Sequence, residues 1–231
     1  MNAPTRSRHE LDGLVVNIEL TLSSIIQGVA LYFLTDNARV VLAARQFTAW
    51  PYVFCGLLVI LLFWARSIIH TLTVIRWPLE FGHNFFYIAC VLVEALAFTR
   101  LTSPGDWFAL LAVFAGLVWG LFLYDLRMIQ NRSEDHAESA SRDLYAMVTG
   151  DQRLNLWPII PIILVYNLGC AWAIHARPDL FIARHGHLAL IACETLGLIV
   201  YLGYVIHSFR RLTPLVARTR EEWLPHPSSE S

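Results

Sequence analysis

Long apolar blocks separated by short polar connectors form the main pattern of this chain. A helix needs about 20 mostly apolar residues to cross a bilayer. The clearest block begins at Trp50 and runs to Ile75, and its first part, from Tyr52 to Trp64, holds no charge. The sequence therefore predicts an all-α integral membrane protein, a bundle of six transmembrane helices. We expect them at about 14–34, 50–75, 83–98, 107–124, 157–174 and 188–206.

The composition supports a lipid environment. The chain is 56% hydrophobic and only 15% charged, whereas soluble domains carry about 25% charged residues. Strands of a membrane barrel would alternate in polarity over about 10 residues, and these blocks do not. The net charge of −1 leaves no basic surface for nucleic acid. We expect a protein of the bacterial cytoplasmic (inner) membrane, with the lipid bilayer as its partner and no nucleic-acid partner.

Polar segments outside the blocks divide the chain further. We expect a cytoplasmic arm at 1–13, a six-span domain at 14–209 and a Pro/Ser-rich, disordered cytoplasmic tail at 210–231. Residues 131–156, which carry mixed charges, are predicted to be a cytoplasmic loop in which a surface helix could form. The first dozen residues are polar and unlike a signal peptide, so we expect the first block to be a retained span.

The distribution of Arg predicts the orientation of the bundle. Six spans place both termini on one side, and that side carries most of the Arg residues. Because positive charge concentrates in cytoplasmic segments, we expect both termini to be cytoplasmic. The predicted cytoplasmic side includes Arg127, Arg132, Arg142, Arg153, Arg210, Arg211, Arg218 and Arg220, whereas the opposite connectors hold Arg39, Arg45, Arg100, Arg177 and Arg184.

The first predicted span is unusually polar along one face. Glu19, Ser23 and Gln27 recur at helical spacing. Apolar residues such as Ile25 lie toward the other side. This pattern predicts one face for lipid and one for protein or water.

Charged side chains predict an inner polar layer near the cytoplasmic surface. Glu19 in span one, Arg66 and His70 in span two and His83 at the start of span three would lie at one level. An unpaired Arg in hydrocarbon costs at least about 3 kcal/mol, so we expect a Glu19–Arg66 ion pair with His70 one turn further on. The pair would either tie two helices together or act as an inner gate or proton-sensitive latch.

Two carboxylates predict a second polar layer. Glu94 and Glu194 lie toward the outer ends of spans three and six, without a basic residue at that depth in either span. Facing each other, they would share a proton or hold a cation. Alternatively, each is protonated or bonded to a neighbour such as Thr195 or Tyr201. The expected transport or ion-site residues are thus Glu94, Glu194, Glu19, Arg66 and His70.

Other motifs add little chemistry. Gly116 and Gly120 form a GxxxG pattern that predicts a helix-packing face. The His185–His187 pair could contribute metal ligands, but no complete ligand set is evident. No hydrolase, zinc-protease, phosphate-loop or cofactor motif occurs. We therefore expect no metal, no cofactor and no catalytic residues, and lean against an enzyme.

Part of the chain resembles a known family. The Trp64-to-His70 end of span two and the Asn84-to-Thr99 stretch of span three are similar to the second and third helices of prokaryotic members of the endolysosomal potassium-channel family. The resemblance covers less than half the chain and implies a compact six-span channel. The family's Phe-Ser-Asp signature is absent, since the first span reads Glu19-Leu-Thr-Leu-Ser-Ser-Ile-Ile-Gln27. We therefore transfer no functional residue from that family.

Together these features predict a cation channel or a proton-coupled small-solute transporter. The alternative is a non-transporting membrane scaffold or assembly factor that acts through its cytoplasmic loop and tail. A homo-oligomer is compatible with such a narrow bundle. The scaffold alternative adds a cytoplasmic protein partner.

Overall fold

The computed structural model describes residues 3–73, 81–133 and 139–222, and within these the side chains of 17–18, 20–71, 82–130 and 142–218. The structure is 93% helical, with no strand in the described residues, which confirms the all-α class. In chain order the elements are α1 (Ala3–Ala43), the 3₁₀ helix η1 (Phe47–Ala49), α2 (Trp50–Thr73), α3 (Phe81–Phe98), α4 (Pro104–Ser133), α5 (Ser139–Leu154), the π-helix η2 (Asn155–Ile159), α6 (Ile160–Ala176), the π-helix η3 (Asp179–Ala183) and α7 (His187–Glu222).

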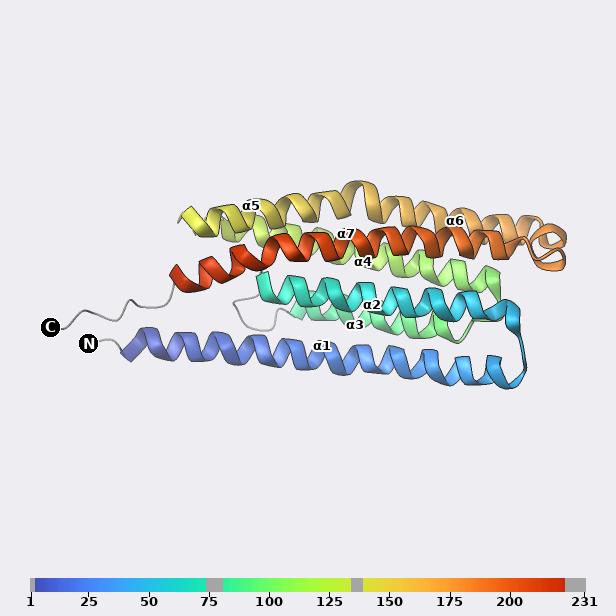
Figure 1. The fold of residues 1–231 in the computed structure, drawn as a ribbon, viewed down its shortest axis with the longest axis horizontal. Helices are drawn as coiled ribbons and strands as arrows, with labels where there is room; N and C mark the ends of the chain where they lie inside the picture. The colour runs from blue at the N-terminus through green and yellow to red at the C-terminus, as the bar shows by residue number, and fades with distance from the viewer. Residues whose placement is uncertain (1–2, 74–80, 134–138, 223–231) are drawn as a thin grey trace.

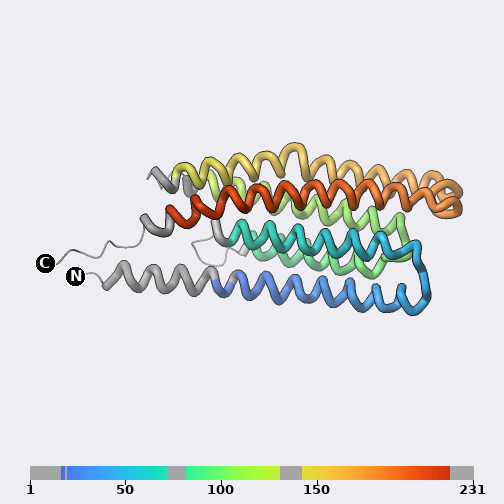
Figure 2. Tube along the Cα trace, viewed as in Figure 1, coloured from blue at the N-terminus to red at the C-terminus, as the bar shows by residue number. Residues whose placement is uncertain are grey.

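The helices lie side by side in one long antiparallel bundle (Figure 1). Helix α4 packs against α3 and α6, α2 packs against α1 and α7, and α5 packs against α7 and α4. Helix α1 lies at one edge of the bundle against α2 and α3. The start of α1 and the end of α7 lie at the same end of the bundle (Figures 1 and 2).

Five helices of the described chain are long and apolar enough to cross a membrane, and the protein is therefore a multi-pass membrane protein. The helix expected as the third of six spans is shorter, because its apolar part covers only Gly82–Phe98. The five candidate spans are Leu20–Ala43, Phe47–Thr71, Pro104–Gln130, Arg142–Ala176 and His187–Arg218.

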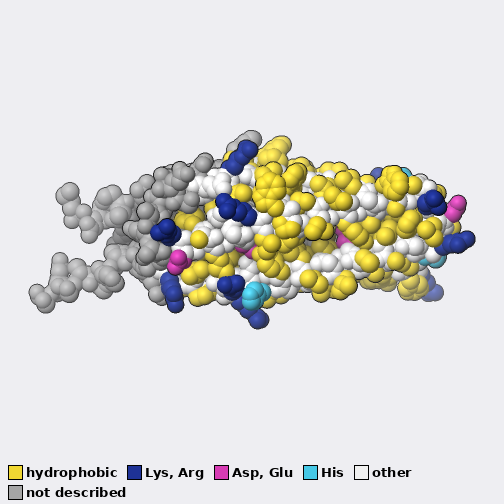
Figure 3. All heavy atoms as spheres, turned by 90° about the horizontal axis from the view of Figure 1, so that it is seen from above, with side chains coloured by type: hydrophobic (Ala, Val, Ile, Leu, Met, Phe, Trp, Pro, Cys, Tyr) yellow, Lys and Arg dark blue, Asp and Glu magenta, His cyan; other side chains and the backbone are white. Residues whose placement is uncertain are grey.

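The surface of the bundle is apolar where lipid would contact it. Large side chains such as Trp172, Val165 and Val200 are 73%, 68% and 67% exposed. Figure 3 shows hydrophobic side chains gathered over the middle of one face, with Arg side chains toward both ends. Meanwhile Glu94, Asn155 and Asn167 are fully buried. The interior is mainly apolar and includes these few buried polar groups, while the apolar exterior differs from the polar surface of a soluble protein.

The terminal segments are more helical than the sequence analysis predicts. Helix α1 begins at Ala3, within the expected arm at 1–13, and α7 continues to Glu222, within the tail expected to be disordered from 210. Residues 223–231 lie outside the described residues. Arg and Glu are good helix formers, so both helices continue past the apolar blocks.

The expected cytoplasmic loop at 131–156 is also largely helical. It contains the last residues of α4, the whole of α5 and the start of η2, while 134–138 lie outside the described residues. Leu144, Tyr145 and Val148 recur at helical spacing and are buried. Because these side chains are stabilised by packing against other helices, α5 packs in the bundle against α7 and α4 rather than forming a separate surface helix.

Pro158 and Pro161, near the start of the span expected at 157–174, lie inside a continuous helical rod that runs from α5 through η2 to α6. Proline cannot donate a backbone hydrogen bond. Around Pro158 the rod adopts a π-turn, in which the Asn155 carbonyl accepts from the amide five residues later. The same register would leave the Leu156 carbonyl facing Pro161, and instead Trp119 Nε1 donates to it at 2.9 Å. The rod therefore passes both prolines unbroken.

Candidate functional site

The polar face predicted for the first span points into the bundle. Ser23 and Gln27 are 7% and 4% exposed, whereas Ile25 is 62% exposed. The Glu19 side chain lies outside the described side chains. The described part of α1 therefore presents polar groups to α2 and α3, as its helical spacing predicts.

An ion pair joins α2 to α5 in the bundle interior. Arg66 Nη2 lies 2.7 Å from Asp151 Oδ2, and both side chains are at most 10% exposed. Tyr204 and Ser208 of α7 also donate hydrogen bonds to Asp151 Oδ1. The Arg66 guanidinium lies 5.4 Å from the centre of the Phe122 ring. Asp151 thus links three helices through one carboxylate.

Arg66 thus has Asp151 as a partner, whereas the expected Glu19–Arg66 pair stays a prediction, because the Glu19 side chain lies outside the described side chains. The sequence shows that a buried Arg needs a partner. It does not show that Asp151 supplies it, since the surrounding charges are typical of a solvated loop. A signal was available in Leu144, Tyr145 and Val148, whose helical spacing indicates a packed helix.

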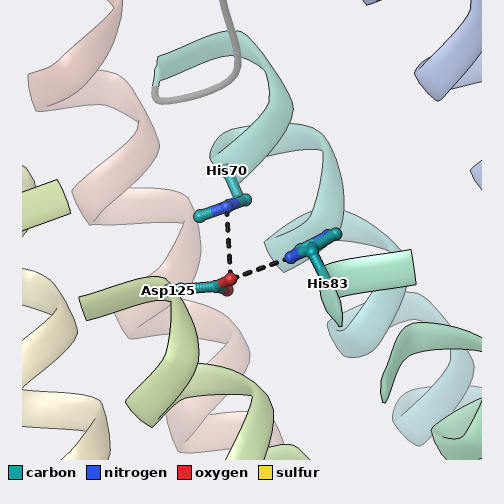
Figure 4. A group of neighbouring side chains, drawn as sticks. All are labelled: His70, His83 and Asp125. Atoms are coloured by element: carbon teal, nitrogen blue, oxygen red, sulfur yellow. Dashed lines mark hydrogen bonds and ion pairs between the residues drawn. The ribbon is translucent and has the colours of Figure 1, made fainter. Parts of the chain in front are cut away.

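A second polar cluster lies at the end of the bundle that holds the start of α1 and the end of α7. His70 of α2, His83 of α3 and Asp125 of α4 point toward one another (Figure 4). His83 Nδ1 is 2.8 Å and His70 Nε2 is 3.6 Å from Asp125 Oδ1. The two imidazole rings are nearly parallel, with centres 5.0 Å apart. Both histidines were expected near Arg66, whereas Asp125 follows directly after the span expected at 107–124.

Arg66 and this cluster line one small cavity. We call it the inner cavity; its volume is about 30 Å³. That is room for one or two water molecules. Arg66, His70 and His83, three of the four residues expected at one level, thus line this cavity with Asp125 and Asp151 as the carboxylates, while the Glu19 side chain lies outside the described side chains. The lining comprises Phe63, Arg66, Ser67, Ile69, His70, His83, Tyr87, Leu121, Phe122, Asp125, Val148, Asp151, Gln152 and Leu212.

Glu94 is held by α1. It is fully buried, and its Oε2 accepts a hydrogen bond of 3.2 Å from Gln27 Nε2. The Tyr87 hydroxyl donates to Gln27 Oε1 at 3.4 Å. Because Tyr87 also lines the inner cavity, a chain of hydrogen-bonding side chains runs from that cavity to Glu94.

Glu194 has different neighbours. It is 7% exposed and lies beside Asn167, Trp107 and Cys55. In the described chain, Glu194 Oε2 and Asn167 Oδ1 have no hydrogen-bond partner. Glu94 and Glu194 therefore have different neighbours. Their described contacts do not bring the two carboxyl groups face to face, which was one of the alternatives that the sequence left open.

Two further hollows adjoin the inner cavity. A middle cavity of about 80 Å³ shares Phe63, Arg66 and Phe122 with it and reaches Asn167 and Glu194. A lateral groove of about 500 Å³ lies between α6 and α7 and also has Asn167 and Glu194 in its lining. The three hollows therefore adjoin in series, with Arg66 between the first two and Glu194 between the last two.

The remaining predicted positions lie away from this series. Phe86 approaches Gly120 closely, at 3.2 Å from where a Cβ would stand, but no atom lies within 4 Å of that point at Gly116. Only one glycine of the GxxxG pattern thus marks a close helix approach. His187 Nδ1 lies 2.9 Å from the Tyr52 hydroxyl, so this outer histidine has a partner outside the His185–His187 pair.

Comparison of the chain with protein-family models, with curated proteins and with solved structures finds no match. The function must therefore be argued from the geometry of this site.

Proposed function

We propose that this membrane protein transports a small cation or solute, either as a cation channel or, as the separate hollows favour, as a proton-coupled carrier. The observation that carries the proposal is the series of inner cavity, middle cavity and lateral groove within an apolar-faced bundle. Ionisable side chains inside a membrane are energetically costly and are a mark of ion and substrate pathways.

Arg66 is the proposed gate. Its pair with Asp151 and its position over the Phe122 ring keep a charged side chain between the inner and middle cavities. Movement of Arg66 would join the two cavities. In the proposed gating, a passing cation would favour an open arrangement in which Arg66 leaves Asp151.

Glu194 is the proposed substrate site. Its Oε2 and the Oδ1 of Asn167 are acceptors without a partner in the described chain. Both residues line the middle cavity and the groove. Buried acceptors normally have a donor, so in this proposal a cation or a donor group of a solute binds to these two oxygens.

Glu94 is the proposed proton site. It does not line the three hollows described above, yet Gln27 and Tyr87 connect it to the inner cavity. In this proposal the proton and the substrate bind to separate carboxylates. Glu94 and Glu194 then have different roles, in place of one shared outer site.

The proposal also includes the topology. We propose six spans in a bacterial inner membrane, with both termini on the cytoplasmic side. The apolar part of α3 is roughly 26 Å long at about 1.5 Å per residue, near the hydrocarbon thickness of about 30 Å. It packs between α1 and α4. An impermeant thiol reagent applied to intact cells is expected to label Arg184→Cys and not Arg142→Cys; labelling only at Arg142→Cys would reverse the orientation.

Flux from liposomes tests the proposal. Purified protein is reconstituted, and potassium, sodium and proton fluxes are measured at two pH values. We expect flux above empty vesicles, and we expect Glu94→Gln to retain downhill flux but to lose its response to a proton gradient. No flux for any of these cations from folded protein would contradict transport and favour the scaffold alternative.

A further inference from the structure

Three helices bring nitrogen and oxygen donors to one point. His70 lies near the end of α2, His83 lies in the first turns of α3, and Asp125 lies in α4. One donor atom from each residue lies within 4.8 Å of the other two, and the cluster is almost fully buried (Figure 4). The three side chains come from separate helices and point into the bundle, so they differ from a cluster of acidic groups on the surface.

The donor atoms lie close to the spacing of a metal site, and small side-chain rotations would make room for an ion. His83 Nδ1 is at hydrogen-bond distance from Asp125 Oδ1, but His70 Nε2, at 3.6 Å, is too far for a hydrogen bond to that oxygen. Tetrahedral sites with metal–ligand bonds of about 2.0–2.2 Å place their ligand atoms roughly 3.4 Å apart. Small side-chain rotations would bring all three donors to that spacing.

The inner cavity supplies the remaining coordination. It has a volume of about 30 Å³ and is lined by the three candidate ligands together with Ser67 and Gln152. One or two waters fit there. Three protein ligands and an open, water-filled position are the usual arrangement of an accessible zinc site.

The local charge is compatible with a cation. Arg66 lines the same cavity, but it is 2.7 Å from Asp151, which neutralises it. Asp125 therefore supplies the carboxylate charge that would balance a bound cation. Two imidazoles and one carboxylate suit divalent transition metals, whereas Mg²⁺ and Ca²⁺ prefer oxygen ligands and Cu⁺ prefers sulfur.

From these observations we infer that His70, His83 and Asp125 bind a divalent transition-metal ion, of which Zn²⁺ is the best fit, with water completing the coordination. The ion ties α2, α3 and α4 together at the end of the bundle where the inner cavity lies. This site is independent of whether the protein transports anything.

Metal binding to the full-length protein, purified without a polyhistidine tag and stripped with a chelator, tests the inference. Zn²⁺ is added, excess is removed, and bound zinc per chain and the thermal unfolding midpoint are measured. We expect one equivalent of zinc and a higher midpoint. His83→Gln and Asp125→Asn should each weaken binding by 10-fold or more, while His185→Gln, which alters the other histidine pair, should leave it unchanged.

The outcomes distinguish this metal site from binding at the other histidine pair and from nonspecific binding of divalent ions. Binding that is lost in His185→Gln but kept in His83→Gln would overturn the inference, as would zinc no tighter than Mg²⁺ in the unsubstituted protein. If the substituted chains do not fold, Co²⁺ bound to the unsubstituted protein decides. Ligand-field absorption bands of a nitrogen–oxygen site of low coordination number support the inference, and their absence at stoichiometric Co²⁺ refutes it.

Discussion

At the scale of single residues, the Arg66–Asp151 pair has the largest energetic consequence. Arg66 Nη2 pairs with Asp151, whereas Nε and Nη1 of Arg66 have no hydrogen-bond partner among the described residues. Removal of the carboxylate would leave a buried, uncompensated charge. Breaking such a pair costs about 3–5 kcal/mol, whereas replacing both partners with apolar residues is often neutral.

We therefore expect Asp151→Asn to lower the free energy of unfolding by about 3 kcal/mol or more. Arg66→Met/Asp151→Asn should recover most of that loss, because it removes the buried charge and keeps an oxygen acceptor for Tyr204 and Ser208. The readout is denaturant unfolding in detergent. The exposed Arg100–Asp106 pair, at 4.0 Å, is the control, since Asp106→Asn should change stability by less than about 1 kcal/mol. Equal effects of Asp151→Asn and Asp106→Asn would mean that the interior pair is not formed.

The partners of the buried charged side chains were the part of the site that the sequence predicted least well. The inward face of Ser23 and Gln27 followed from helical spacing. The partners of Arg66 and of the histidines did not, because Asp151 and Asp125 are each near a connector in the sequence and their depth depends on where a helix ends. Contacts between helices far apart in the chain are not encoded in local spacing.

At the scale of elements, the rod formed by α5, η2 and α6 departs most from the sequence pattern. Proline usually marks a helix start or a break, and Pro158 and Pro161 were therefore expected to open a span. The structure accommodates them because one π-turn changes the hydrogen-bond register and Trp119 of α4 satisfies the Leu156 carbonyl. That compensation comes from another helix and cannot be read from the rod itself.

The Trp119 contact gives a prediction for this element. Trp119→Phe keeps an aromatic ring but removes the donor to the Leu156 carbonyl, and Leu156 is fully buried. An unsatisfied buried acceptor costs about 1–3 kcal/mol, so we expect a loss of stability of that size in thermal or denaturant unfolding. Trp172→Phe is the matched control, because Trp172 is 73% exposed. A Trp119→Phe protein as stable as the control would show that the π-turn does not depend on α4.

At the scale of the whole molecule, the apolar exterior of the helical bundle was predictable, because block length and hydropathy determine it. The membrane class and the helical bundle therefore followed from the sequence. The count of six spans depends on α3, whose apolar part is the shortest. The arrangement of the hollows was not predictable, since it arises where α2, α4, α6 and α7 meet.

Glu194 lines both the middle cavity and the lateral groove. Our central proposal is that it lies on a transport path between them. The neighbouring Cys193 also lines the groove, but it is exposed and carries no charge. Cys193→Ala therefore controls for reconstitution and folding of the same helix.

The decisive measurement is cation flux into liposomes containing the unsubstituted protein, Glu194→Gln or Cys193→Ala at equal protein density. We predict that Glu194→Gln reduces flux at least 10-fold while Cys193→Ala retains it. Undiminished flux through Glu194→Gln, in protein shown to be folded, would contradict the path described here.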